Sequence, residues 1–289
     1  MRIDQLLVQR GLAPTRSQAQ RLIASGVQWQ SPDGCWHTAH KSGDTVAPDA
    51  PLRLLDAAQT RYVSRGGLKL EAALAHCGLD VTGWRCLDVG QSTGGFTDCL
   101  LRHGAASVLG VDVGHDQLHP RLRDDPRVCA LQGVNARHLN ATDLIALTAD
   151  QTGGSGQFFI QIGDTETERP AFDLIVADLS FISQTLVLPV LVPLLAPRGW
   201  LITLVKPQFE LQPQHIGKGG LVKDPALYRA VRQRLEAACV TLNLQLRHWL
   251  DSPIAGGDGN REFFMAAQPG CAGHPAPYHH DPAPPAHQH

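Results

Sequence analysis

Apolar residues near the N-terminus recur at helical spacing. Positions 3, 6 and 7 are Ile, Leu and Leu, which would share one face of a helix. After a break at residues 11–14, Thr15 followed three residues later by Gln18 forms a capping-box pattern for a second helix, which Gly26 ends. The run Ser-Pro-Asp-Gly at 31–34 predicts a turn between short strands. We therefore expect a compact helix-helix-hairpin unit at the start of the chain.

From residue 85 the pattern changes to short apolar runs that alternate with helical stretches. This alternation is typical of a mostly parallel sheet covered by helices on both faces. It predicts an α/β fold, a Rossmann-like seven-stranded domain. Strands are expected near residues 85–89, 107–112, 127–131, 172–177, 200–205, 244–249 and 262–267. The stretch 151–169, rich in Gly, Thr and Gln, is expected to leave this core.

Length and composition suit two folded units. The 289 residues are 43% hydrophobic and 18% charged, which is enough apolar content for sizeable cores. We predict a small N-terminal α+β domain at 1–61, a catalytic domain at 62–268 and a disordered tail at 269–289. The tail holds six prolines and five histidines in 21 residues, and we expect no packed element or metal site there.

Several classes of protein are disfavoured. The seven cysteines include no Cys-x-x-Cys pair, so neither a disulfide framework nor a structural zinc site is indicated. The first residues form no apolar signal region, and the apolar stretch 186–196 is short and interrupted by two prolines. The sequence favours a cytoplasmic protein that does not enter a membrane.

Basic residues are concentrated toward the N-terminus. Residues 1–69 carry nine Lys or Arg against five Asp or Glu, whereas the remainder carries sixteen against twenty-two. Cations on the exposed face of the first helices would suit a ribose-phosphate backbone, although a solvated arginine face is the simpler interpretation. The run from Arg2-Ile3-Asp4 to Arg16-Ser17 resembles the S4 RNA-binding domain, which favours RNA. The candidate RNA-binding residues are Arg2, Arg10, Arg16, Arg21 and Arg65.

Residues 86–98 run from an apolar strand through a Gly-rich turn into a helix, which is typical of a nucleotide-binding corner. The spacing matches neither G-x-G-x-x-G nor a P-loop. The next strand ends at Asp112, 24 residues after Asp88, where a carboxylate can accept the hydroxyls of an adenosine ribose. Asn135 follows the third strand and either contacts the adenine or forms a turn. The candidate cofactor-binding residues are Asp88, Gly90, Ser92, Gly94, Gly95, Phe96, Asp112 and Asn135.

Four residues suit methyl transfer to a hydroxyl: Lys69, Asp178, Lys206 and Glu262. Asp178 and Lys206 directly follow apolar strands, so both should project from the edge that holds the cofactor. A ribose 2′-hydroxyl needs a base, and a lysine serves only when burial or a nearby cation lowers its pKa. Lys206 is the candidate base and Lys69 the nearby cation, with the two acids orienting the amines and holding the ribose. Taken singly, each could be a surface charge.

Five segments together resemble the hemolysin-A-like (TlyA) family of ribosomal RNA methyltransferases. They lie at 62–70, 88–98, 178–183, 205–210 and 259–264, and the resemblance extends over residues 1–268. It implies an S4-type domain fused to an FtsJ-type catalytic domain, S-adenosylmethionine as cofactor and 2′-O methylation of cytidine in ribosomal RNA or ribosomal subunits, by a monomer. The four residues named above match the Lys-Asp-Lys-Glu set of that class. Gln91 departs from the family, which usually has a small residue there, and is expected either to narrow the cofactor turn or to point to solvent.

Other functions stay open at this point. A base methyltransferase acting on amino groups would favour [DN]-P-P-[FYW], whereas 178–181 reads Asp-Leu-Ser-Phe, and cytosine C5 chemistry would commonly need a Pro-Cys that the chain lacks. A membrane-lytic protein, which the family's name suggests, has no supporting segment. A noncatalytic RNA-binding assembly factor would keep the same fold.

Overall fold

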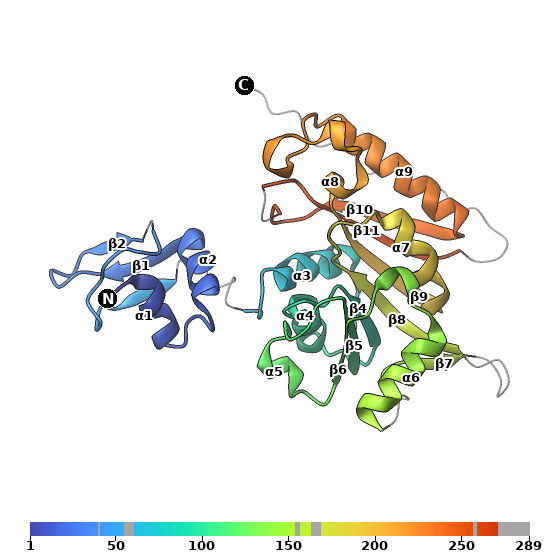
Figure 1. The fold of residues 1–289 in the computed structure, drawn as a ribbon, viewed down its shortest axis with the longest axis horizontal. Coiled ribbons are helices and arrows are strands. Elements are labelled where there is room, and N and C mark those ends of the chain that lie inside the picture. Colours follow the sequence, from blue (N-terminus) through green and yellow to red (C-terminus); the bar gives the residue numbers. More distant parts are fainter. Residues whose placement is uncertain (40, 55–60, 154–156, 163–168, 257–258, 271–289) are drawn as a thin grey trace.

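The computed structural model describes residues 1–39, 41–54, 61–153, 157–162, 169–256 and 259–270 of the chain. These residues form a small N-terminal unit and a larger α/β unit, which Figure 1 shows side by side. The His/Pro-rich tail predicted to be disordered lies, from residue 271 on, outside the described residues. The predicted boundaries at 61 and 268 remain predictions.

The N-terminal unit has the expected helix-helix-hairpin order. Helices α1 (Ile3–Gln9) and α2 (Arg16–Gly26) pack on a three-stranded antiparallel sheet of order β2-β1-β3, formed by β1 (Val27–Gln30), β2 (Trp36–Thr38) and β3 (Leu52–Leu54). The Thr15 side chain caps α2 by accepting the Gln18 N–H at 3.3 Å. The apolar stripes of both helices are buried against Val27 in one core. The capping and periodicity expected from the sequence are confirmed.

The larger unit is built on an open mixed sheet. Its strands lie in the order β10-β11-β9-β8-β4-β5-β6, with β7 paired to the start of β8. The bounds are β4 Arg85–Val89, β5 Ser107–Asp112, β6 Val128–Gln132, β7 Ile160–Ile162, β8 Arg169–Ala177, β9 Leu195–Val205, β10 Leu244–Asp251 and β11 Phe263–Pro269. Neighbours from β6 to β9 are parallel, and β11 is antiparallel to both β9 and β10. The order of the parallel strands reverses beside β4, the place where doubly wound sheets bind ligands.

Helices cover both faces of this sheet (Figure 1). One core packs the sheet against α6, α7 and α9, and the other packs it against α3 and α4. Successive strand residues alternate between these cores, as Cys86 and Leu87 do, because neighbouring side chains of a strand point to opposite faces. The α-helices are α3 Gly66–Cys77, α4 Gly95–Arg102, α5 Pro120–Arg123, α6 Ala141–Thr152, α7 Gln184–Leu191, α8 Pro207–Glu210 and α9 Leu227–Thr241. The short 3₁₀ helices are η2 Ala136–His138, η3 Val192–Leu194, η4 Pro213–His215 and η5 Lys218–Gly220.

The expected excursion at 151–169 is corrected in part. Phe158 and Phe159 are each 1% exposed and belong to the core under α6, and β7 extends the sheet through β8. The segment is polar in composition, but these two aromatic residues pack it onto the core. Residues 154–156 and 163–168 lie outside the described part of the chain.

Candidate active site

A cavity of about 270 Å³ opens at the carboxyl ends of β4 and β8, beside the point where the strand order reverses. Three segments contribute to it: the approach to α3, the turn between β4 and α4, and the residue after β8. The lining residues are Ser64, Arg65, Gly66, Lys69, Gly90, Gln91, Ser92, Thr93, Gly95, Phe96 and Asp178. Part of the candidate cofactor set and two candidate catalytic residues, Lys69 and Asp178, therefore share one cavity.

Two glycines make room for the turn. Gly90 has φ +83°, and a Cβ there would lie 2.6 Å from the backbone oxygen of Asp178. A Cβ on Gly95 would lie 2.1 Å from the Ser64 Oγ. Any larger residue would push the turn away from β8 or from the segment before α3. We call this turn the glycine cradle, because its small residues pack closely against the protein and both line the cavity.

Behind the turn lies a buried polar chain. Gln91 Nε2 donates to Thr97 Oγ1 at 2.9 Å, and the Thr97 hydroxyl donates to Asp88 Oδ2 at 2.7 Å. Gln91 therefore does not point to solvent: it is 6% exposed, packs over Gly110 of β5 and lines the cavity. Asp88 is fully buried, and its Oδ1 has no hydrogen-bond partner among the described residues. Burial, with the charges of Asp178 and Asp112 adding to it, raises the pKa of Asp88 to about 7.

The other cofactor candidates lie around this turn at different depths. Asp112 accepts the backbone N–H groups of Ser92 at 2.8 Å and Gly114 at 2.7 Å, so it holds the turn from the end of β5. Asn135 caps η2 through Arg137 N and lines a separate depression of about 330 Å³. Among the candidates, Gly90, Ser92, Gly95 and Phe96 line the cavity, and Asp88, Gly94, Asp112 and Asn135 are not among its lining residues.

The four predicted catalytic residues form two amine–carboxylate pairs. Lys69 Nζ lies 2.5 Å from Glu262 Oε2, with both side chains less than a tenth exposed. Lys206 Nζ lies 2.6 Å from Asp178 Oδ1 and donates to Ser180 Oγ at 2.9 Å. This second pair is more open to solvent, because 27% of the Asp178 side chain is exposed.

Strand register explains why the two pairs meet. Phe263 lies opposite Val205 in the antiparallel β11–β9 ladder, so Glu262 lies beside Lys206 at the end of that ladder. Ala177 of β8 lies beside Thr203 of the parallel β9, which places Asp178 at the same edge. Lys69 reaches this edge from the first turn of α3. Both Lys69 and Asp178 line the cavity.

Phe181 is a site residue that pattern reading missed. It is 88% exposed and has φ +63°, a backbone conformation that a bulky side chain rarely adopts. Its ring lies 4.9 Å from the ring of Phe209, centroid to centroid, so the two aromatic rings are neighbours beside Ser180 and Lys206. The only sequence feature that pointed to Phe181 was its place in the run Asp-Leu-Ser-Phe, because the exposure and backbone angle of a residue cannot be inferred from the sequence. Such strained, exposed residues gather at functional sites.

The predicted RNA-binding arginines have mixed surroundings. Arg2 and Arg16 both pair with the buried Asp4, at 3.0 and 3.1 Å, and each remains about half exposed. The side chain of Arg10 donates to the backbone oxygens of Pro48 and Ala50. Arg65 is one of the residues that line the cavity. The Arg21 side chain lies outside the described part of the structure.

An open sheet of this order, with a glycine cradle at its switch point and paired amines and acids at the same edge, defines a cofactor-dependent α/β enzyme. Comparison with known proteins narrows the class. Residues 62–268 match the family described as FtsJ-like methyltransferase, and residues 1–26 match the S4 domain. The 16S/23S rRNA (cytidine-2′-O)-methyltransferase TlyA of Mycobacterium tuberculosis is 40% identical over 269 residues, which cover 91% of this chain and 88% of the relative. The chain belongs to the TlyA family of FtsJ-like methyltransferases.

Two further relatives carry a different name. Hemolysin A of Brachyspira hyodysenteriae is 34% identical over 91% of this chain and 98% of its own length. A solved structure from Streptococcus thermophilus, also named a hemolysin, covers 94% of this chain and 91% of its own, with 35% identity and a TM-score of 0.66. Among the described residues, every helix is too short or too polar to cross a bilayer.

Proposed function

We propose that this protein transfers a methyl group from S-adenosylmethionine to the 2′-hydroxyl of cytidine in ribosomal RNA. The observation that carries the proposal is the meeting of two lysine–carboxylate pairs, Lys69–Glu262 and Lys206–Asp178, at one edge of a methyltransferase sheet. The names of the Mycobacterium tuberculosis and Campylobacter jejuni TlyA relatives support the reaction and the substrate. The S4 match supports RNA as partner. We expect a monomer that works in the cytoplasm, where ribosomes are assembled.

The residues present suit this cofactor. Gly90 and Gly95 line the cavity and have no room for a larger residue, and Asp88 Oδ1 is a buried oxygen whose partners are not supplied by the described residues. We assign the ribose hydroxyls of the cofactor to Asp112 and its adenine to the side of Asn135. The bound cofactor supplies an electrophilic methyl group on a sulfonium. The protein's residues position the ribose for methyl transfer and accept its proton.

Lys206 is the proposed base, because its amine is the one held near solvent beside Ser180, where a ribose can enter. Asp178 orients this amine, which in its neutral form would accept the proton of the 2′-hydroxyl while the methyl group exchanges its bond to sulfur for a bond to the 2′-oxygen. Lys69, fixed by the buried Glu262, faces the cavity as a positive charge that stabilises negative charge on the attacking oxygen. We assign the exposed ring of Phe181 to stacking on the target base.

The test is a nucleoside analysis of the product. Purified protein is incubated with ribosomal RNA or subunits lacking the modification and with methyl-labelled cofactor, and the RNA is digested to nucleosides. We expect the label in 2′-O-methylcytidine. A label on a base would favour a base methyltransferase, and RNA binding without any label would favour an assembly factor that has lost catalysis.

A further inference from the structure

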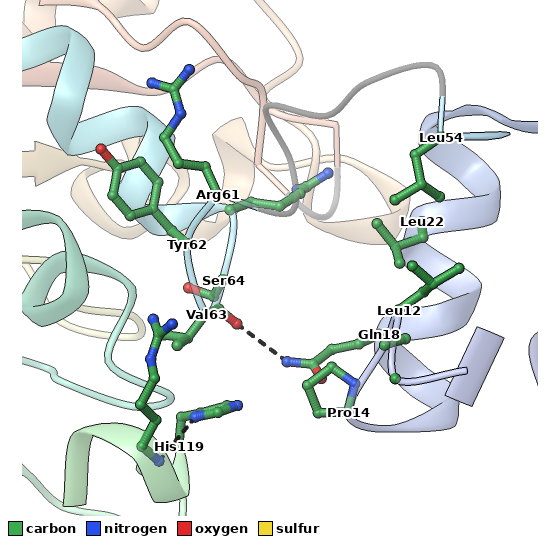
Figure 2. Close-up of a pocket in the computed structure, with 14 residues that line it drawn as sticks. Leu12, Pro14, Gln18, Leu22, Leu54, Arg61, Tyr62, Val63, Ser64 and His119 are labelled. Atoms are coloured by element: carbon green, nitrogen blue, oxygen red, sulfur yellow. Dashed lines mark hydrogen bonds between the residues drawn. The ribbon is translucent and has the colours of Figure 1, made fainter. Parts of the chain in front are cut away.

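A second cavity, of about 360 Å³, lies between the N-terminal unit and the start of the catalytic unit (Figure 2). Its two walls differ in chemistry. The N-terminal unit supplies apolar side chains: Leu12, Pro14, Leu22 and Leu54. The catalytic side supplies basic side chains: Arg61, Arg65, His119 and Arg121. No carboxylate is found among the described residues that line it.

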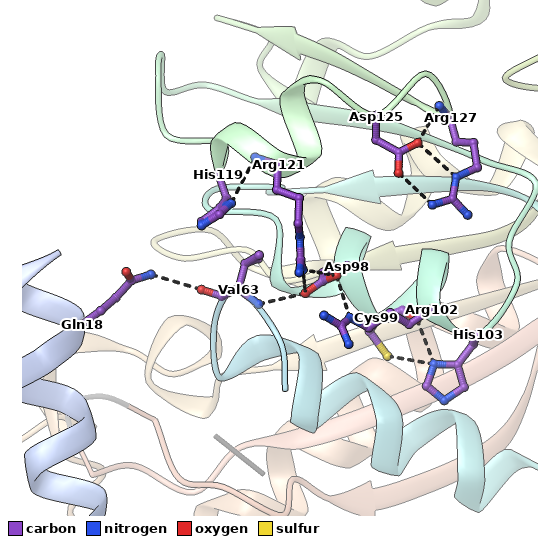
Figure 3. Close-up of polar contacts among 10 residues, drawn as sticks. All are labelled: Gln18, Val63, Asp98, Cys99, Arg102, His103, His119, Arg121, Asp125 and Arg127. Carbon is purple, nitrogen blue, oxygen red and sulfur yellow. Dashed lines mark hydrogen bonds and ion pairs between the residues drawn. The ribbon is translucent and has the colours of Figure 1, made fainter. Parts of the chain in front are cut away.

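Ion pairing does not cancel the positive wall. Asp98 accepts from Arg121 at 2.8 Å, but it also accepts from Arg102 at 3.0 Å (Figure 3). Arg61 pairs with Glu71, and among the described residues no hydrogen bond or ion pair is seen for the side chain of Arg65. Four arginines are thus offset by two carboxylates. Arg121 is 54% exposed, so its guanidinium can still accept a further anionic partner.

A hydrogen bond joins the two walls, and a second one anchors the catalytic wall to α4. The Gln18 side chain of α2 donates to the backbone oxygen of Val63 at 3.2 Å, and the Val63 N–H donates to Asp98 at 2.9 Å (Figures 2 and 3). The residues that follow Val63, Ser64 and Arg65, line both this cavity and the active-site cavity. The interdomain cavity is therefore a formed space adjoining the place where the target nucleotide would sit.

We propose that this cavity holds one nucleotide of the substrate RNA, a neighbour of the methylated one. Its base lies against the apolar wall at Leu12 and Pro14, and its phosphate lies against Arg121 and Arg65. A nucleotide has this same division into a flat apolar part and an anionic part, and the cavity is of a size that holds small ligands. The inference rests on the proposed function only in taking RNA as substrate.

The test compares charge and apolar variants with a matched control. Arg121→Ala removes an exposed arginine that faces the cavity, and Arg127→Ala removes another exposed arginine, paired with Asp125, that is not among the lining residues (Figure 3). Leu12→Asp places a carboxylate on the apolar wall at a residue that is already 37% exposed, and Leu12→Asn controls for the lost apolar contact. Thermal melting of each variant confirms that it folds.

Binding is measured by fluorescence anisotropy with a labelled 12-nucleotide oligouridylate at several salt concentrations. We expect Arg121→Ala to weaken binding about five- to tenfold and to reduce the slope of log affinity against log salt by about 0.7, the value for one phosphate of a single strand. Leu12→Asp should weaken binding about tenfold, Leu12→Asn less, and Arg127→Ala less than twofold.

Unchanged affinity and salt slope in both Arg121→Ala and Leu12→Asp would overturn the proposal. Displacement of the RNA by polyglutamate at equal charge would also overturn it, because that result would indicate an acidic protein partner. Methylation of ribosomal RNA by the unaltered protein is assayed alongside. If the variants lose oligouridylate affinity but the unaltered protein does not methylate ribosomal RNA, the result would support the nucleotide-binding cavity and contradict the proposed reaction.

Discussion

The buried pair Lys69–Glu262 offers a way to separate the stability of the active site from its chemistry. Replacing Glu262 by Leu leaves the Lys69 ammonium in a site where its side chain is 9% exposed, without the carboxylate that lies 2.5 Å away. An uncompensated buried charge of this kind costs about 3 to 5 kcal/mol. At about 2 to 4 °C per kcal/mol for a domain of this size, the midpoint of thermal unfolding should fall by about 6 to 20 °C.

The double variant Lys69→Met with Glu262→Leu removes both charges and keeps comparable side-chain volume. Replacing a buried ion pair by apolar residues is often neutral or stabilising, so most of the lost thermal stability should return. Methyl transfer should be lost in both variants. In the single variant the Lys69 cation facing the cavity has no paired carboxylate, and in the double variant the cation is missing.

Two assays decide this prediction: thermal unfolding followed by circular dichroism, and single-turnover transfer of labelled methyl to ribosomal RNA. If the Glu262→Leu variant unfolds at the same temperature as the unaltered protein, the pair is not buried as described. A double variant that is stable and active would remove both residues from the mechanism.

Three further predictions follow from other parts of the site. Lys206→Ala should lower single-turnover methyl transfer by about 10²- to 10⁴-fold, the usual contribution of a positioned base, while calorimetric cofactor affinity stays within about threefold. Lys206→Arg should not restore the rate, and undiminished turnover in either variant would exclude Lys206 as base. Phe181→Ala should weaken RNA binding by about 1 to 3 kcal/mol without altering cofactor affinity, and equal RNA affinity would refute stacking. Because Asp88 binds its proton more tightly in the folded state (pKa about 7) than unfolded, the stability it contributes is full below pH 4 and is lost as pH rises to 7, by up to about 4 kcal/mol. Asp88→Asn should therefore gain stability relative to the unaltered protein between pH 5 and 8 in urea unfolding, and a constant difference would contradict the burial of that carboxylate.

The fold was largely predictable because it depends on local patterns. Parallel strands buried on both faces appear as continuous apolar runs, and all seven expected strands are present within a few residues of their predicted bounds. The convergence of Asp178 and Lys206 followed from the same reasoning, since both directly succeed such strands. Lys69 and Glu262 were named for their chemistry and for their match to the family's Lys-Asp-Lys-Glu set, because no local pattern places the first turn of α3 beside the start of β11.

What the sequence did not reveal depends on contacts between distant residues. Whether Arg16 faces RNA or a buried Asp4, and whether Gln91 points to solvent or to Thr97, is decided by side chains that meet only after folding. The burial of Phe158 was hidden by the polar residues around it. The cavity between the two units depends on the Gln18–Val63 contact, which joins residues 45 positions apart.

The central claim is that paired amines and acids at one sheet edge direct methyl transfer to a ribose oxygen. Its most direct test is to map alkali-resistant linkages in ribosomal RNA from cells that carry this gene, cells that lack it and cells that carry only the Lys206→Ala form, since a 2′-O-methyl group blocks alkaline cleavage at its own nucleotide. We expect one or more protected cytidines in the first cells, absent from the other two. Identical protection in all three would contradict the account.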